Sequence, residues 1–168
     1  FKTGPGPRLA QDSFTARAFV TYKKGDEGAL FGAGDNLGGY ALYIKDSKLR
    51  FHFNWLAYKH FHVDSDIELP EGDLELAFDF CLTRPGAGLG RLLIDGRPSG
   101  NMYVESQPLF QGGTFSVGKF PFVSPAGDMK EKKRFPYTNR IDRVEFDLAR
   151  PIGDMEQMLE LEQALKNE

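Results

Sequence analysis

Alternation of apolar and polar residues in two long segments constrains the fold of this chain more than any other feature. In Leu74–Thr83 the apolar side chains Leu, Leu, Phe, Phe and Leu occupy every second position, and Phe14–Tyr22 alternates in the same way except at Phe19. Successive side chains of a β-strand point to opposite faces, so a period of two indicates a strand with one buried face. Both segments are therefore predicted to be strands that line a core.

Shorter segments of similar character recur between turn residues, and Asp46-Ser47 has the form of a tight hairpin turn. The 15 phenylalanines suit a pleated surface, and the 19 glycines and 10 prolines suit the turns. No helical period appears before the last residues, so we predict an all-β, antiparallel β-sandwich. The shorter strands are expected at 29–32, 40–45, 48–54, 58–64, 91–94, 101–105, 114–118 and 140–148.

The end of the chain has a different period. Apolar residues recur at helical spacing after Asp154, which is suited to cap a helix, so we expect a short helix at 154–166. An irregular segment at 119–137 carries a basic KEKKR run and is expected to be a functional or mobile loop. The chain thus divides into a linker at 1–13, a β-sandwich at 14–150 and a C-terminal helical segment at 151–168.

Composition and charge exclude several classes of function. The net charge of −3 and the pI near 5.7 give no electrostatic reason to expect a nucleic-acid partner. No apolar run approaches the roughly 18 residues that span a bilayer, so no membrane partner is expected. The single cysteine, Cys81, excludes an internal disulfide. Because the sequence begins with Phe1 rather than Met, we expect it to be part of a longer protein.

All three histidines of the chain lie in two neighbouring expected strands, 48–54 and 58–64. The short link between these strands suggests a hairpin. Aligning the apolar sides of the two strands places His52, His60 and His62 together on the other face. The sequence therefore predicts one polar face that carries all three imidazoles.

This histidine cluster has two interpretations. Pairing Asn54 with Tyr58 would set His52 directly opposite His60, and a His-x-His pair with a third histidine can hold Zn²⁺ with an open position for water. The alternative is a polar face on which side chains stack on and hydrogen-bond to a sugar. The candidate carbohydrate-binding residues are His52, Asn54, Trp55, Tyr58, His60 and His62.

Carboxylates suggest two further sites. In the GAGDN stretch at 32–36, Asp35 and Asn36 with backbone carbonyls could offer oxygen ligands to Ca²⁺, although such stretches also form plain turns. The acids of Glu71–Glu75 have the E-x-D-x-E spacing of retaining glucanases, but Gly72 indicates a turn that would keep them off one rigid face. No catalytic residue is expected in this chain, and its own hydrolase activity is only a third hypothesis.

Three motifs resemble the C-terminal domain that is attached to many bacterial arylsulfatases. Residues 38–54, GGYALYIKDSKLRFHFN, resemble that domain's GGxxLYVKDGxLxFxYN segment, and LLIDG at 92–96 resembles its LYVDG hairpin. FSVG at 115–118, with the later SP and FPYTxxIxxVxxDL motifs up to residue 148, resembles its ending. The resemblance spans about residues 14–148.

This resemblance implies a concanavalin-A-like, laminin-G-like jelly roll. It also implies a non-catalytic accessory domain that packs on the catalytic domain of a sulfate-ester hydrolase, whose formylglycine and metal would lie outside this chain. It favours a periplasmic or secreted location. A carbohydrate-binding, lectin-like module is the alternative function, and no cofactor is expected in this chain other than possible calcium.

Overall fold

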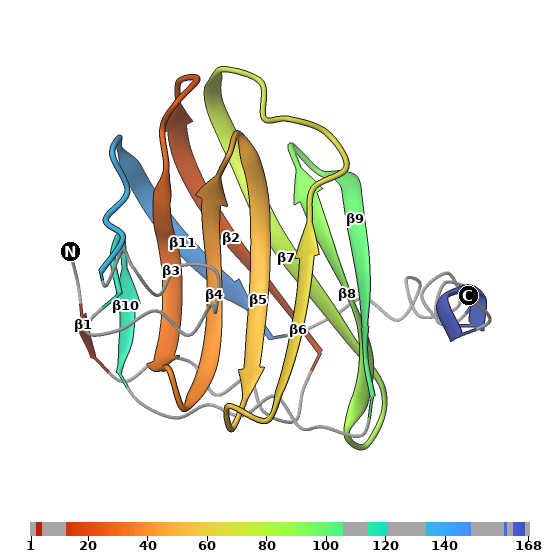
Figure 1. Ribbon diagram of the computed structural model, residues 1–168. Helices are drawn as coiled ribbons and strands as arrows, with labels where there is room; N and C mark the ends of the chain where they lie inside the picture. Colours follow the sequence, from red (N-terminus) through yellow and green to blue (C-terminus); the bar gives the residue numbers. More distant parts are fainter. Residues whose placement is uncertain are drawn as a thin grey trace.

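Two antiparallel sheets lie face to face in the structure, a computed structural model that describes residues 3–4, 13–105, 114–120, 134–148, 160 and 163–166 (Figure 1). The six-stranded sheet has the order β1-β10-β3-β4-β5-β6, and the five-stranded sheet has the order β11-β2-β7-β8-β9. The predicted antiparallel sandwich is confirmed. The strands are β1 (Thr3–Gly4), β2 (Phe14–Tyr22), β3 (Gly28–Asp35), β4 (Gly38–Lys45), β5 (Lys48–Trp55), β6 (Lys59–Asp64), β7 (Gly72–Arg84), β8 (Ala87–Ile94), β9 (Arg97–Val104), β10 (Phe115–Val117) and β11 (Ile141–Asp147).

The core lies between the sheets and is built mainly from the alternating residues seen in the sequence. In β2 every second residue is buried, as the period of two predicts. Phe51 of β5 stacks on Phe78 of β7 across the two layers, with ring centroids 3.5 Å apart. Burial of each such side chain contributes about 1.5–3 kcal/mol, so these contacts fix which face of each sheet points inward.

The outer face of the six-stranded sheet has two unlike halves. Over β3 and β4, the rings of Phe120 and Phe135 pack on Ala29, Ala41 and Tyr43. Gly32 makes room for this cover, because a Cβ there would lie 3.0 Å from Cε1 of Phe120. Over β5 and β6 the same face is polar, and it is the face that Figure 1 turns toward the viewer.

Several boundaries differ from the expectations. Strand β7 begins at Gly72 rather than Leu74, so Asp73 belongs to the strand and not to a turn. Thr3–Gly4, within the expected linker, pairs with β10. Such a short pairing has no sequence signal, because two residues cannot show a period.

The C-terminal helix is described only in part. Glu160 and residues 163–166 are helical, whereas the rest of the expected helix lies outside the described residues. Leu165 packs against Cys81 and Leu89, so this short helix contacts the outer face of the five-stranded sheet. Most of the expected loop at 119–137 also lies outside the described residues.

Candidate functional site

Strands β5 and β6 form the expected hairpin with a different register. His52 pairs with His62, and Asn54 pairs with His60, so the predicted pairing of His52 with His60 is wrong by two residues. The reason is that β5 continues to Trp55, which pairs with Lys59 and leaves a three-residue turn at 56–58. A shift of two residues keeps each side chain on its face, so all three histidines still share the outer face.

The three imidazoles form one cluster. Nε2 of His52 lies 2.7 Å from Nδ1 of His60, which is a hydrogen bond. The His52 and His62 rings are stacked, with centroids 6.2 Å apart and planes 20° apart. His52 is 7% exposed, whereas His60 and His62 are exposed. The buried imidazole therefore braces one exposed neighbour by a hydrogen bond and the other by stacking.

A hollow of about 220 Å³ lies beside this cluster. The Arg50 guanidinium in it lies 3.1 Å from Oδ2 of Asp46 and 3.5 Å from Oδ2 of Asp64. Two carboxylates therefore hold the guanidinium in place and balance its charge. The hollow is lined by Tyr43, Arg50, His52, His62 and Asp64.

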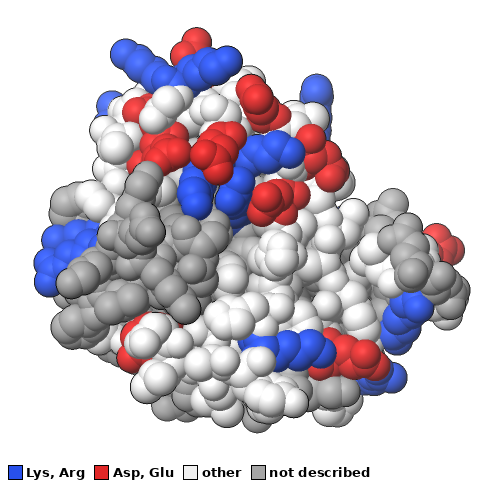
Figure 2. Space-filling view, viewed as in Figure 1, with Lys and Arg blue, Asp and Glu red and all other residues white. Residues whose placement is uncertain are grey.

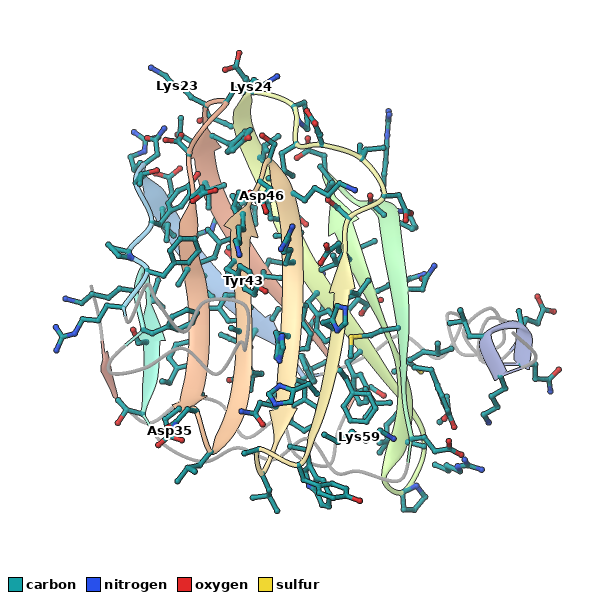
Figure 3. All side chains as sticks on the ribbon, in the orientation of Figure 1. Lys23, Lys24, Asp35, Tyr43, Asp46 and Lys59 are labelled. Atoms are coloured by element: carbon teal, nitrogen blue, oxygen red, sulfur yellow. The ribbon has the colours of Figure 1, made fainter. Side chains whose placement is uncertain are left out.

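Sequence reasoning missed part of this lining. Arg50 and Asp64 could have been found, because they alternate with the histidines on the polar sides of their strands. Tyr43 could not, because β4 is buried on both faces and its pattern does not show which side chains reach the hollow. Figure 3 shows Tyr43 near the middle of β4, with Asp46 toward the upper end of the sheet.

The remaining carbohydrate candidates lie apart from the histidines. Asn54 is 1% exposed, and its amide donates to the Asn36 carbonyl and accepts from the Ala57 amide. Trp55 packs against the core cluster on the inner side of the sheet. Tyr58, in contrast, is 81% exposed at the end of the hairpin. Of these three, only Tyr58 extends the surface available to a ligand.

Two exposed leucines and Tyr58 define an apolar rim at the lower edge of the six-stranded sheet in Figure 1. Leu37 is 65% exposed in the β3–β4 turn, and Leu56 is 52% exposed in the β5–β6 turn. The hydrogen bond of 3.1 Å from Asn54 to the Asn36 carbonyl links these two turns. The rim is therefore one surface made by two hairpins.

Metal binding has little geometric support. No group of three or more His, Cys, Asp or Glu side chains within the described ranges is placed to hold a metal ion, the histidine cluster included. Oδ1 of Asp35 accepts the Leu37 amide at 2.8 Å, and the Asn36 carbonyl accepts the Asn54 amide, as in an ordinary turn. Calcium at Asp35 and Asn36 stays a prediction.

The acids near the start of β7 are engaged by different neighbours. Glu71 accepts the Lys24 amide at 2.8 Å, Asp73 accepts the Thr21 hydroxyl at 2.7 Å, and Glu75 pairs with Arg17 at 3.3 Å. These contacts are those of turns and strand pairs rather than of two carboxyls across a substrate.

No helix of the described residues is long and apolar enough to cross a membrane.

Comparisons with known proteins identify the fold. No protein-family model matches the chain, and no curated protein is similar to it in sequence. Among solved structures, domains LG4-5 of the mouse laminin α1 chain superpose with a TM-score of 0.61 and 16% identity, over 85% of this chain and 38% of that one. The native heptameric SAP-like pentraxin from Limulus polyphemus superposes with a TM-score of 0.51 and 16% identity, over 82% of this chain and 64% of that one.

These likenesses define the class: a concanavalin-A-like, laminin-G-like jelly roll, as the sequence resemblance implied. The chain spans less than two thirds of the length of either structure, and identities this low establish the fold alone. Neither structure is a sulfatase, so the arylsulfatase resemblance gains no support from them.

Proposed function

We propose that this chain is a non-catalytic, lectin-like module that binds carbohydrate on the outer face of β5 and β6. The observation that carries this proposal is the hollow beside exposed imidazoles. It combines a guanidinium donor with a carboxylate acceptor. We call this surface, made of Tyr43, Arg50, His52, His60, His62 and Asp64, the histidine face.

Sugar hydroxyl groups donate and accept hydrogen bonds, so they match a site with both kinds of partner. Arg50 is positioned by Asp46 and Asp64 before a ligand arrives, which lowers the entropic cost of binding. The exposed imidazoles of His60 and His62 offer flat faces and further nitrogen atoms to hydroxyl groups.

Calorimetric titration of the chain with neutral and sulfated polysaccharides tests this proposal. We expect saturable binding. His62→Ala should weaken it by about tenfold, since the imidazole of His62 can no longer hydrogen-bond to the sugar or stack on it. Asn101→Ala, an exposed change on β9 of the other sheet, is the matched control and should bind normally. Absence of saturable binding to every polysaccharide would overturn the proposal.

A second candidate is a non-catalytic accessory domain of an arylsulfatase-like sulfate-ester hydrolase. The three sequence motifs support it, and the apolar rim of Leu37, Leu56 and Tyr58 offers a surface for packing on a catalytic domain. The hollow does not include the rim residues, so a domain packed on the rim would leave the hollow open but would cover Tyr58. Sequencing the gene upstream of Phe1 tests this role: a Cys/Ser-x-Pro-x-Arg motif is expected there, and a parent protein without one would contradict it.

A further inference from the structure

The outer face of β6 is a linear array of ligand-capable side chains. In the described sheet β6 is an edge strand that pairs only with β5. His60, His62 and Asp64 alternate along this face, and the six residues of the strand extend over about 20 Å. Tyr58 follows at one end of the strand, and the hollow lies at the other. This length is greater than that of a single sugar ring.

The arginine and the lysine nearest to the array are both engaged by neighbouring side chains. In the hollow, Arg50 is already paired with two carboxylates, Asp46 and Asp64. Lys59 is paired with Trp55 in the sheet and, like Trp55 and Phe61, alternates with the histidines rather than sharing their face. Its Nζ lies 4.9 Å from the centre of the Phe61 ring. Figure 2 shows an area without charged side chains between the charged groups at the top and those near the lower edge. A sulfate ester on the outer face of β6 would therefore meet no Lys or Arg side chain of β6 itself, and the arginine in the hollow is already paired.

The Tyr58 end is a prearranged stacking platform. The ring of Tyr58 meets the ring of Trp55 edge to face, with centroids 5.7 Å apart and planes 79° apart. Asn54 accepts the Ala57 amide and the Trp55 carbonyl accepts the Tyr58 amide, so the turn that carries the ring is fixed on both sides. An exposed aromatic ring held in this way suits the apolar face of a sugar.

From these three observations we infer that the ligand of the histidine face is an uncharged oligosaccharide, which lies along β6 from the hollow to Tyr58. This inference rests on the proposed carbohydrate function and specifies its ligand. The sugar unit in the hollow hydrogen-bonds to Arg50 and Asp64, the middle units contact His62 and His60, and the last unit stacks on Tyr58.

Chain-length dependence tests the inference. Mono- to hexasaccharides of glucose, galactose, mannose and xylose, with sulfated galactose oligomers beside them, are titrated against the chain and against Tyr58→Ala. For the preferred neutral sugar, affinity should rise with length until the ligand reaches Tyr58. Tyr58→Ala should then cost between about twofold and tenfold for the long ligands and nothing for the shortest. Ile67→Ser, a change at an exposed apolar residue in the β6–β7 connection, should have no effect at any length.

The outcomes separate this inference from the proposed function. If sugars bind but affinity does not depend on length, if Tyr58→Ala has no effect, or if sulfated oligomers bind more tightly than neutral ones, the inference is wrong while the module still binds carbohydrate. If no sugar of the panel binds, both fail. The single tryptophan, Trp55, gives an independent readout, because its emission should change only with ligands long enough to reach Tyr58.

Discussion

The two hairpin turns that flank β5 both have two consecutive residues with positive φ, but the residue types differ. In the β4–β5 turn, Asp46 and Ser47 have φ of 52° and 62°, and in the β5–β6 turn, Leu56 and Ala57 have φ of 51° and 56°. Asp tolerates this left-handed region because its short polar side chain bonds locally, whereas Leu and Ala do not gain in this way.

The residues of the first turn suit its backbone conformation, whereas those of the second turn instead expose an apolar side chain. Asp46 bonds to Arg50 and so contributes to the hollow. Leu56 contributes no hydrogen-bonding side chain, is 52% exposed and belongs to the apolar rim. Strained positions that persist against local preference are concentrated at functional sites. We therefore interpret the second turn as one that trades stability for the position of Leu56 and Tyr58.

The largest expected effect follows from removal of the brace under the second turn. Asn54→Ala should lower the free energy of unfolding by about 2 kcal/mol, because it removes a side chain that is 1% exposed together with its hydrogen bonds to the Asn36 carbonyl and from the Ala57 amide. Urea denaturation measures this loss. The same change at exposed Asn101 should cost less than about 0.5 kcal/mol, and equal losses at the two positions would contradict the bracing role.

Relief of the backbone strain at Leu56 and Ala57 should raise, rather than lower, the free energy of unfolding. Leu56→Asn with Ala57→Gly gives the second turn the residues preferred at positive φ and should raise the midpoint of thermal unfolding, with a gain of about 1–2 kcal/mol. Ser47→Gly in the first turn should gain less, since Asp46 is already suited to its conformation. A destabilised double variant would show that packing of Leu56, rather than its backbone, dominates.

A third turn, between β2 and β3, is held by a carboxylate. Burial opposes ionisation of Asp26, but hydrogen bonds from Asn139, the Lys23 amide and Thr138 outweigh it, so the pKa of Asp26 lies below its ordinary value. The ionised carboxylate is thus favoured in the folded state. The ionised Asp26 carboxylate therefore contributes fully to the free energy of unfolding above its unfolded-state pKa, near 4. This stabilisation is lost as the pH falls through the lower pKa of the folded state.

Asp26→Ala should therefore cost about 1 kcal/mol at pH 7, and the cost should shrink as the pH is lowered below about 4. Urea denaturation of both proteins across this pH range measures the difference. A penalty that does not change with pH would show that the hydrogen bonds do not require the charge.

The smallest effect on stability is expected for the charge of the first turn. Asp46→Asn keeps a residue that tolerates positive φ and removes one partner of Arg50, so stability should change by less than about 0.5 kcal/mol. Titration with sulfated oligosaccharides should nevertheless detect tighter binding, because Arg50 retains less compensating charge. Unchanged affinity for sulfated ligands would weaken the charge argument for the hollow.

The sequence predicted the architecture better than the site. The alternation in β2 and β7 predicted the facing layers, because burial of one face imposes a period of two. The same parity placed the three histidines on one face even though their register was wrong. Register depends on how many residues the turn uses, and the Leu56–Tyr58 turn has none of the usual Asn-Gly or Asp-Gly signals.

Other parts of the site could not be predicted from periodicity. Trp55 was grouped with the histidines, but its place in β5 turns it toward the core. The cover by Phe120 and Phe135 brings together segments far from β4 in sequence, and no local pattern reports such contacts. The role of Asn54 as a brace depends on the Asn36 carbonyl in another hairpin, which is a tertiary contact as well.

The thiol of Cys81, the single cysteine, is fully buried against Leu89 on the five-stranded sheet. The histidine face and the apolar rim both lie on the other sheet. Shielding of this kind keeps the native protein slow to react with maleimides. A cysteine introduced in place of Leu37, which is 65% exposed, would be an accessible thiol for labelling. A fluorophore attached there would report binding at the hairpin tips in real time, and Cys81 would not have to be replaced first.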